Sequence, residues 1–168
     1  MESADLLVDA FERIRDTVHR AVDGLTSEDL GFRPEGTGNS IAWLVWHLTR
    51  VQDDHMADVA GTEQVWTSSG WADRFALPLG ASDTGYGHGS HQVAAVTVDA
   101  ELLGGYHDEV HQATLRFVRT VSDVDLDRIV DERWDPPVSL GVRLVSVIDD
   151  DLEHGGQAAY VRGMLERR

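Results

Sequence analysis

Apolar residues recur every three or four positions in four long segments of the chain, and this spacing predicts four amphipathic helices. The segments span residues 3–22, 40–60, 100–121 and 140–165. A serine, aspartate or asparagine that can cap the free amides of a first helical turn stands at the start of the first three. Four helices of similar length predict an all-α protein folded as a four-helix bundle.

The second and third helices are separated by a long segment without a sustained pattern, residues 61–98. This segment is rich in glycine, contains Trp66 and Trp71, and includes the turn-forming run DTGYGHGSHQ and a short helix near residues 90–96. A crossover of this length is too long for a simple helical hairpin, so it argues against an up-down-up-down bundle. Long connections in compact domains often form a lid or a pocket wall.

The remaining connection precedes the fourth helix and has the sequence VDERWDPPVSLGVR. Its Pro136 and Pro137 cannot lie inside a helix, so it predicts a small extended or hairpin element. No internal repeat or low-complexity tract is present in the sequence. A length of 168 residues suits one hydrophobic core, and we expect a single domain over residues 1–168.

The charge balance excludes two classes of partner. All 14 basic residues are arginine, and they face 30 acidic residues, which gives a formal net charge of −16. A negative field of this size repels phosphate backbones and anionic lipids. We therefore expect neither nucleic acid nor a membrane surface as a partner.

The absence of cysteine limits the chemistry that the chain can perform alone. Without a thiol there is no disulfide, no thiolate nucleophile and no zinc–thiolate centre, so histidine and carboxylate must carry any metal chemistry. The amino terminus interleaves charged and apolar residues, and no apolar run approaches the ~20 residues of a membrane span. The sequence predicts a cytoplasmic protein.

Asp150 and His154 form the sharpest candidate site. They lie one turn apart on the fourth helix, and a helical wheel places them in one sector of about 60° with the apolar Val147, Val161 and Leu165. Both are therefore expected to point inward. His47, at the edge of the apolar stripe of the second helix, can supply a third ligand from across the interior. Three protein ligands leave one position open, as in catalytic metal sites. An Asp–His hydrogen bond and a hydrogen-bonded core histidine are the alternatives.

The other histidines compete less well for the same ion. His55 is about 12 Å along the helix axis from His47, too far to share one ion easily. His107 and His111 form a second pair one turn apart, as ligands or as pocket lining. We expect three further histidines at the surface: His19, His88 and His91.

Arginines and further aspartates supply secondary candidates. Arg143, Arg162 and Arg50 lie in segments from which they could hold an anionic group of a substrate, or they are ordinary surface charges. In the acidic runs DDH and DDD, only Asp150 has a periodicity that favours an inward position. Exposed tryptophans would favour assembly into a homodimer.

The helix motifs NSIAWLVWHLTRVQDDH and DDDLEHGGQAAYVRG, together with GWADRF, DTGYGHG and RWDPPVSLGVRLVSV, resemble the DinB-like superfamily. The resemblance runs through essentially the whole chain and is nearest to the actinobacterial branch of mycothiol-dependent transferases and isomerases. It implies a four-helix bundle in up-down-down-up order. It also implies a divalent metal held by one ligand from the second helix and two from the fourth.

Residue by residue, the histidine of the family's W-H-L motif matches His47, and its terminal histidine before G-Q matches His154. The family's third ligand, usually histidine, is Asp150 in this chain. A set of two imidazoles and one carboxylate still suits a divalent metal, most simply zinc or nickel, although the carboxylate weakens a preference for late transition metals. Superfamily members use mycothiol, bacillithiol or glutathione as cosubstrate.

The resulting hypothesis is a metal-dependent S-transferase in which a small thiol such as mycothiol attacks a small electrophile. A metal ion favours the nucleophilic thiolate, so the enzyme needs no cysteine of its own. Two alternatives remain open. One is a non-catalytic, stress-associated binding protein, and the other is a metal-dependent hydrolase that uses bound water.

Overall fold

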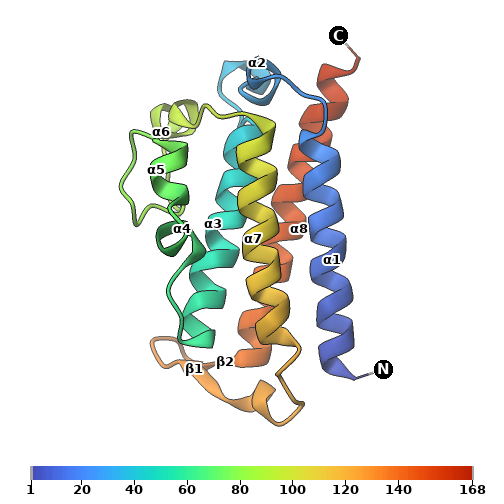
Figure 1. Ribbon diagram of the computed structural model, residues 1–168, viewed down its shortest axis with the longest axis vertical. Helices are drawn as coiled ribbons and strands as arrows, with labels where there is room; N and C mark the ends of the chain where they lie inside the picture. The colour runs from blue at the N-terminus through green and yellow to red at the C-terminus, as the bar shows by residue number, and fades with distance from the viewer. Residues whose placement is uncertain (1, 168) are drawn as a thin grey trace.

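The computed structural model describes residues 2–167, and it is mostly helical, as predicted (Figure 1). The four long helices are α1 (Ser3–Val22), α3 (Ile41–Ala60), α7 (Ala100–Val118) and α8 (Leu140–Leu165). The shorter elements are α2 (Ser27–Leu30), η1 (Pro34–Gly36), α4 (Val65–Ser68), α5 (Trp71–Phe75), α6 (Ser90–Ala95), η2 (Asp125–Asp127), β1 (Ile129–Asp131) and β2 (Val138–Ser139). The sequence pattern missed α2, α4 and α5, because segments of four or five residues show no helical period.

The four long helices lie side by side (Figure 1). Helices α1 and α8 run from the bottom to the top of this view, whereas α3 and α7 run from top to bottom. Helix α8 packs against α1 and α3, and α7 packs against the same two helices from the other side. The sequence that links α3 to α7 is the long crossover, which carries α4, α5 and α6.

Side-chain caps fix where three of the long helices begin. The side chains of Ser40, Asp99 and Ser139 each accept a hydrogen bond from the backbone amide three residues later, at the start of α3, α7 and α8. These bonds satisfy amides that have no partner inside the helix. Helix α3 ends at Gly61, whose backbone adopts the left-handed conformation that favours glycine.

The apolar interior consists of two clusters with buried polar residues between them. One cluster lies around Leu44, Leu48 and Ala158, and the other around Met56, Leu144 and Val147. The buried polar residues on the segments that separate them include Thr49, Arg50, Gln52, Asp53, His107, His111, Thr114 and Asp151. Some of their atoms have no hydrogen-bond partner, among them His107 Nε2 and both carboxyl oxygens of Asp151.

Asp151 corrects one prediction from the sequence, since it is buried with 1% of its surface exposed while Asp150 is only partly buried. The buried face of α8 carries Leu144, Val147 and Ala158, and Asp151 lies at the centre of that face. Burial, followed by the charge of Asp150, raises the pKa of Asp151 well above its usual value. The carboxyl is therefore neutral where most aspartates are ionised.

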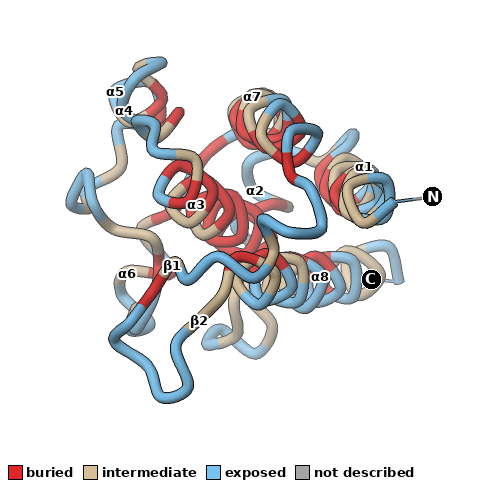
Figure 2. The backbone as a smooth tube through the Cα atoms, turned by 90° about the horizontal axis from the view of Figure 1, so that it is seen from below, coloured by how far each residue is buried: buried red, intermediate tan, exposed pale blue. Residues whose placement is uncertain are grey.

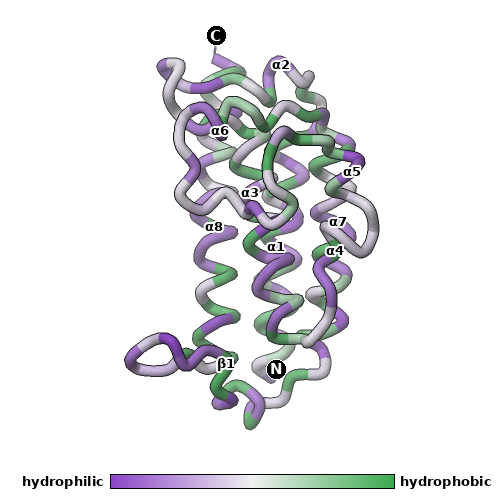
Figure 3. The backbone as a smooth tube through the Cα atoms, turned by 90° about the vertical axis from the view of Figure 1, so that its left-hand side faces the viewer, coloured by the Kyte–Doolittle hydropathy of each residue, from purple (hydrophilic) through white to green (hydrophobic). Residues whose placement is uncertain are grey.

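The crossover makes α3 the most enclosed helix of the molecule. Every residue from 41 to 50 is buried, and Figure 2 shows α3 almost uniformly buried whereas α8 keeps an exposed outer face. Figure 3 shows the crossover and α6 lying across the upper half of the long helices. The tryptophans of α3 and the crossover are buried, contrary to the expectation of exposed tryptophans, whereas Trp134, between β1 and β2, is 65% exposed.

The segment before α8 forms the predicted hairpin, in which β1 pairs with β2 in antiparallel register. Asp131 of β1 accepts hydrogen bonds from Arg133 and from Arg143 of α8, which ties the hairpin to that helix. Among the described residues, no helix combines the length and the apolar character that crossing a lipid bilayer requires.

The neutral state of Asp151 predicts a measurable pH dependence. In unfolded protein this carboxyl ionises near pH 4, but in the folded state it keeps its proton. Its own contribution to the free energy of unfolding therefore falls as the pH rises above about 4, by up to about 1.4 kcal/mol per pH unit. In Asp151→Asn this loss should be absent. Urea denaturation of chelator-treated protein between pH 4 and 7 measures it, with the exposed Asp149→Asn as control. Parallel pH profiles for wild type and Asp151→Asn would contradict the assignment.

Candidate metal centre

His47 of α3 and Asp150 and His154 of α8 converge on one point. Their potential ligand atoms all lie within 4.8 Å of one another. Asp150 Oδ1 is 3.7 Å from His154 Nε2, and the imidazole rings of His47 and His154 have their centroids 4.8 Å apart. The close packing of α3 on α8 and the one-turn spacing on α8 produce this arrangement.

Both imidazoles are held by hydrogen bonds at Nδ1. His47 Nδ1 bonds the backbone carbonyl of Thr84 in the crossover, and His154 Nδ1 lies 3.1 Å from the side-chain oxygen of Gln157. An oxygen acceptor at Nδ1 fixes the proton there and leaves Nε2 with its lone pair toward the cluster. This orientation is the one that a metal-binding histidine requires.

The indole of Trp43 packs against both imidazoles of the cluster. The ring of Trp43 stacks on His47 at 4.7 Å and meets His154 edge-on at 6.2 Å. Its indole nitrogen donates a hydrogen bond to His88 Nδ1, and His88 in turn stacks on Trp46. The side chain of His88 is 4% exposed, which corrects the prediction of a surface histidine. Its position in a glycine-rich loop gave no sign of this burial.

The electrostatics of the cluster suit a cation. Burial lowers the pKa of His47, the hydrogen bond to Thr84 opposes this effect, and the neighbouring His154 adds to it. His47 is therefore held neutral, the form that binds metals. Asp150 Oδ2 is buried without a hydrogen-bond partner, although a buried carboxylate oxygen normally has one. Two oriented imidazoles and an incompletely paired carboxylate fit a divalent metal ion.

Gly85 lets the crossover close over the cluster. Its backbone has φ +97°, and a Cβ atom at this position would lie 2.5 Å from His47 Nδ1. Only glycine allows such an approach of the main chain to the imidazole. The loop of residues 82–89 is therefore part of the site, in keeping with the prediction that the long crossover forms a lid or a pocket wall.

A sequence model of the mycothiol-S-transferase family matches residues 6–166. The chain belongs to the mycothiol-S-transferase family. This membership confirms the predicted resemblance to the mycothiol-dependent branch of the DinB-like superfamily.

The fold is shared with a solved structure described as a conserved protein from Enterococcus faecalis. The two chains superpose with a TM-score of 0.92 at 28% sequence identity, over 100% of this chain and 99% of the other. No curated protein matches the sequence significantly.

His55 and Arg143 lie beside the cluster of His47, Asp150 and His154 and are not part of it. Arg143 is 3.0 Å from His55 Nδ1 and also pairs with Asp131 at 3.1 Å. Burial and the charge of Arg143 lower the pKa of His55, and the charge of Asp150 acts on it in the opposite direction. His55 and Arg143 therefore lie near Asp150, on the side that faces the hairpin end of α8.

His107, His111 and Arg50 are fully buried in other places. His107 contacts Thr49 at 3.2 Å, and burial lowers its pKa to about 3. His111 lies 3.4 Å from Glu12 of α1.

Arg50 bonds Gln64 and Tyr106 and lies 3.5 Å from Asp53, so it is an interior charge and cannot hold a substrate at the surface. Arg162 caps the end of α1 through the carbonyls of Arg20 and Asp23.

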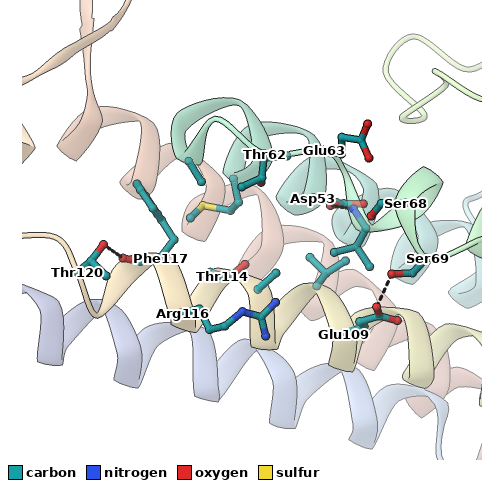
Figure 4. Close-up of a pocket in the computed structure, with 16 residues that line it drawn as sticks. Asp53, Thr62, Glu63, Ser68, Ser69, Glu109, Thr114, Arg116, Phe117 and Thr120 are labelled. Carbon is teal, nitrogen blue, oxygen red and sulfur yellow. Dashed lines mark hydrogen bonds between the residues drawn. The ribbon is translucent and has the colours of Figure 1, made fainter.

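A cavity of about 450 Å³ lies between α3, α4 and α7 (Figure 4). Met56, Val65 and Phe117 line its apolar part, and Glu63 and Arg116 stand at its polar part. The carboxylate of Glu109 accepts hydrogen bonds there from the Ser69 hydroxyl and from the indole nitrogen of Trp71. None of the three cluster residues lines this cavity, so it is separate from the metal centre.

Gly85 generates a prediction with an internal control. Gly87 also has a positive φ, but nothing lies within 4 Å of a Cβ placed there. Gly87→Ala should therefore cost only the strain of the left-handed backbone, about 1 kcal/mol of unfolding free energy. Gly85→Ala should cost more and should also weaken zinc binding by about tenfold to a hundredfold, because it displaces the oxygen that orients His47.

Denaturation and competition for zinc with a chromogenic chelator measure both quantities. Equal zinc affinities for Gly85→Ala and Gly87→Ala would show that the loop does not position His47.

Proposed function

We propose that this protein is a metal-dependent S-transferase that joins the sulfur of mycothiol to a small electrophile. The observation that carries the proposal is the convergence of His47, Asp150 and His154 with both Nε2 atoms directed inward. Three protein ligands leave room for a further ligand, as catalytic sites do. Membership of the mycothiol-S-transferase family supports the choice of thiol.

The chain has no cysteine, so the reacting sulfur must come from a cosubstrate. A divalent cation in the site would lower the pKa of a bound thiol and favour the thiolate, which is the nucleophile. In the transfer, a sulfur–carbon bond forms and the bond from carbon to the leaving group breaks. The leaving group departs with the electron pair, and the thiol proton is released to solvent.

The residues of the site have distinct roles in this proposal. His47, Asp150 and His154 hold the metal, while the Thr84 carbonyl and Gln157 orient the two imidazoles. The walls formed by Trp43 and His88 exclude water, which strengthens the electrostatic interactions inside. Two nitrogen ligands favour zinc or nickel, although the Asp150 oxygen also accepts harder ions.

The proposal places this site in an up-down-down-up four-helix bundle, with α3 and α8 as the ligand-bearing pair. Arg143 and His55 are candidates to contact polar groups of a substrate, because they lie on the Asp150 side of the centre. His107 and His111 are too enclosed for that role. A cytoplasmic location, an actinobacterial source and a homodimer stay predictions.

The first test of the proposal is metal content. Purified protein should hold close to one equivalent of divalent metal, and His154→Ala should lower this by at least about tenfold, because it removes one of three ligands. The exposed His91→Ala is the matched control and should keep the metal. Elemental analysis after gel filtration gives the answer, and equal loading of parent and His154→Ala would reject the site.

The second test is the dependence of turnover on thiol. Zinc-loaded protein should convert an electrophile such as iodoacetamide only when a thiol is present, and the rate should rise through the pH range in which the bound thiol ionises. Mycothiol should be a better cosubstrate than glutathione. Cleavage of an ester or amide at a rate that thiol leaves unchanged would point to hydrolysis by metal-activated water.

A further inference from the structure

An apolar cavity of about 400 Å³ lies one helical turn beyond the metal centre, between α8, the first turn of α3 and the loop that precedes it. Its lining residues are Pro34, Asn39, Leu44, Gly156, Gln157, Tyr160 and Val161. Its volume is within the range of small-molecule sites in proteins. The roles assigned above to the cluster residues make no use of it.

The position of this cavity relative to the centre follows from the helix directions. Leu44 precedes His47 by three residues on α3, and Gln157 follows His154 by three residues on α8. Since α3 and α8 run in opposite directions, both steps lead the same way along the pair, by about 5 Å each. The cavity therefore lies on the same pair of helices as the cluster, about one turn further along.

Gln157 connects the cavity to the centre directly. Its side-chain oxygen is the partner of His154 Nδ1, and the same residue lines the cavity. Its amide nitrogen carries two further donors that can meet a polar substituent of a bound molecule. A ligand in the cavity would thus touch a residue that orients a metal ligand.

The chemistry of the walls selects the ligand class. Leu44, Val161 and Pro34 are apolar, the ring of Tyr160 is 69% exposed, and no charged side chain lines the cavity. On a chain with a net charge of −16, a charge-free apolar cavity beside the centre favours an uncharged aromatic or alkyl group. Exposed apolar surface of this kind gains free energy when such a group covers it.

Gly156 provides the space. A Cβ atom built on this residue has no other atom within 4 Å, so the absence of a side chain leaves the cavity wall open at this point of α8. Glycine inside a helix costs stability relative to other residues. At position 156 the glycine lowers helix stability, but its lack of a side chain leaves room for a ligand.

We propose that this cavity binds the apolar part of the electrophile, an uncharged aryl or alkyl group, and that Gly156 sets the size of the group accepted. This inference rests on the proposed function, because it names the class of electrophile that the S-transferase would take. The reacting carbon would lie toward the cluster and the apolar group toward Tyr160.

The test compares two substitutions with opposite expectations. Gly156→Leu fills the cavity and places a better helix former in α8, so the variant should fold. Ala159→Leu adds a similar side chain at an exposed position of α8 outside the cavity and serves as control. Both variants and the parent are loaded with zinc and assayed with mycothiol against 1-chloro-2,4-dinitrobenzene and against iodoacetamide.

Gly156→Leu should lower kcat/KM for 1-chloro-2,4-dinitrobenzene by about tenfold or more, the scale of discrimination by an apolar pocket, and should leave iodoacetamide within about twofold. Ala159→Leu should change neither rate. Equal loss with both electrophiles, or no loss with either, would overturn the proposal.

A binding measurement separates this inference from the proposed function. Nitrobenzene titrated into the parent should shift the backbone amide signals of Gly156 and Gln157 in ¹⁵N–¹H spectra, and Gly156→Leu should abolish the shifts of the remaining lining residues. If neither electrophile reacts but these shifts occur, the cavity site stands and the transferase assignment fails. If the shifts are absent from the parent, or persist unchanged in Gly156→Leu, the cavity site is wrong.

Discussion

The enclosure of α3 on all sides is the constraint on which the rest of the structure depends. A bundle helix normally keeps one face in solvent, but here residues 41–50 are all buried because the crossover covers the face that the other long helices leave open. His47 therefore lies between α8 and the crossover, and both supply part of its surroundings: His154 and Asp150 from α8, the Thr84 carbonyl from the crossover. Without the crossover the imidazole would lack its orienting acceptor.

A buried polar network secures this enclosure. Asp53 of α3 accepts hydrogen bonds from the backbone amides of Val65 and Trp66 and from the Tyr106 hydroxyl of α7. Arg50, one turn earlier, bonds the carbonyl of Asp83 in the loop beside the centre. Breaking such a network by removing one member leaves buried groups unpaired and costs several kcal/mol. The same pair of α3 residues thus joins the crossover to the bundle at two points, at its start and at the loop beside the centre.

The sequence predicted the long helices well because their apolar periods extend over five or more turns. It placed Asp150 and His154 together because a one-turn spacing fixes a shared helix face. His47 was predicted from its place at the edge of an apolar stripe and from the family's W-H-L motif. It did not predict that the side chains of Asp151 and His88 are buried. Asp151 differs from Asp150 by one position, and such a rotation depends on packing across the bundle. His88 is buried by contacts with tryptophans 42 and 45 residues away in sequence, which local pattern does not encode.

The central claim is that two imidazoles and one carboxylate hold a divalent ion that also binds the cosubstrate's sulfur. X-ray absorption at the zinc edge of the loaded protein tests it most directly. The account predicts a shell of nitrogen and oxygen at about 2.0–2.2 Å and, after addition of mycothiol, one sulfur at about 2.3 Å. A spectrum of oxygen ligands alone, unchanged in His47→Ala and unaffected by thiol, would contradict it.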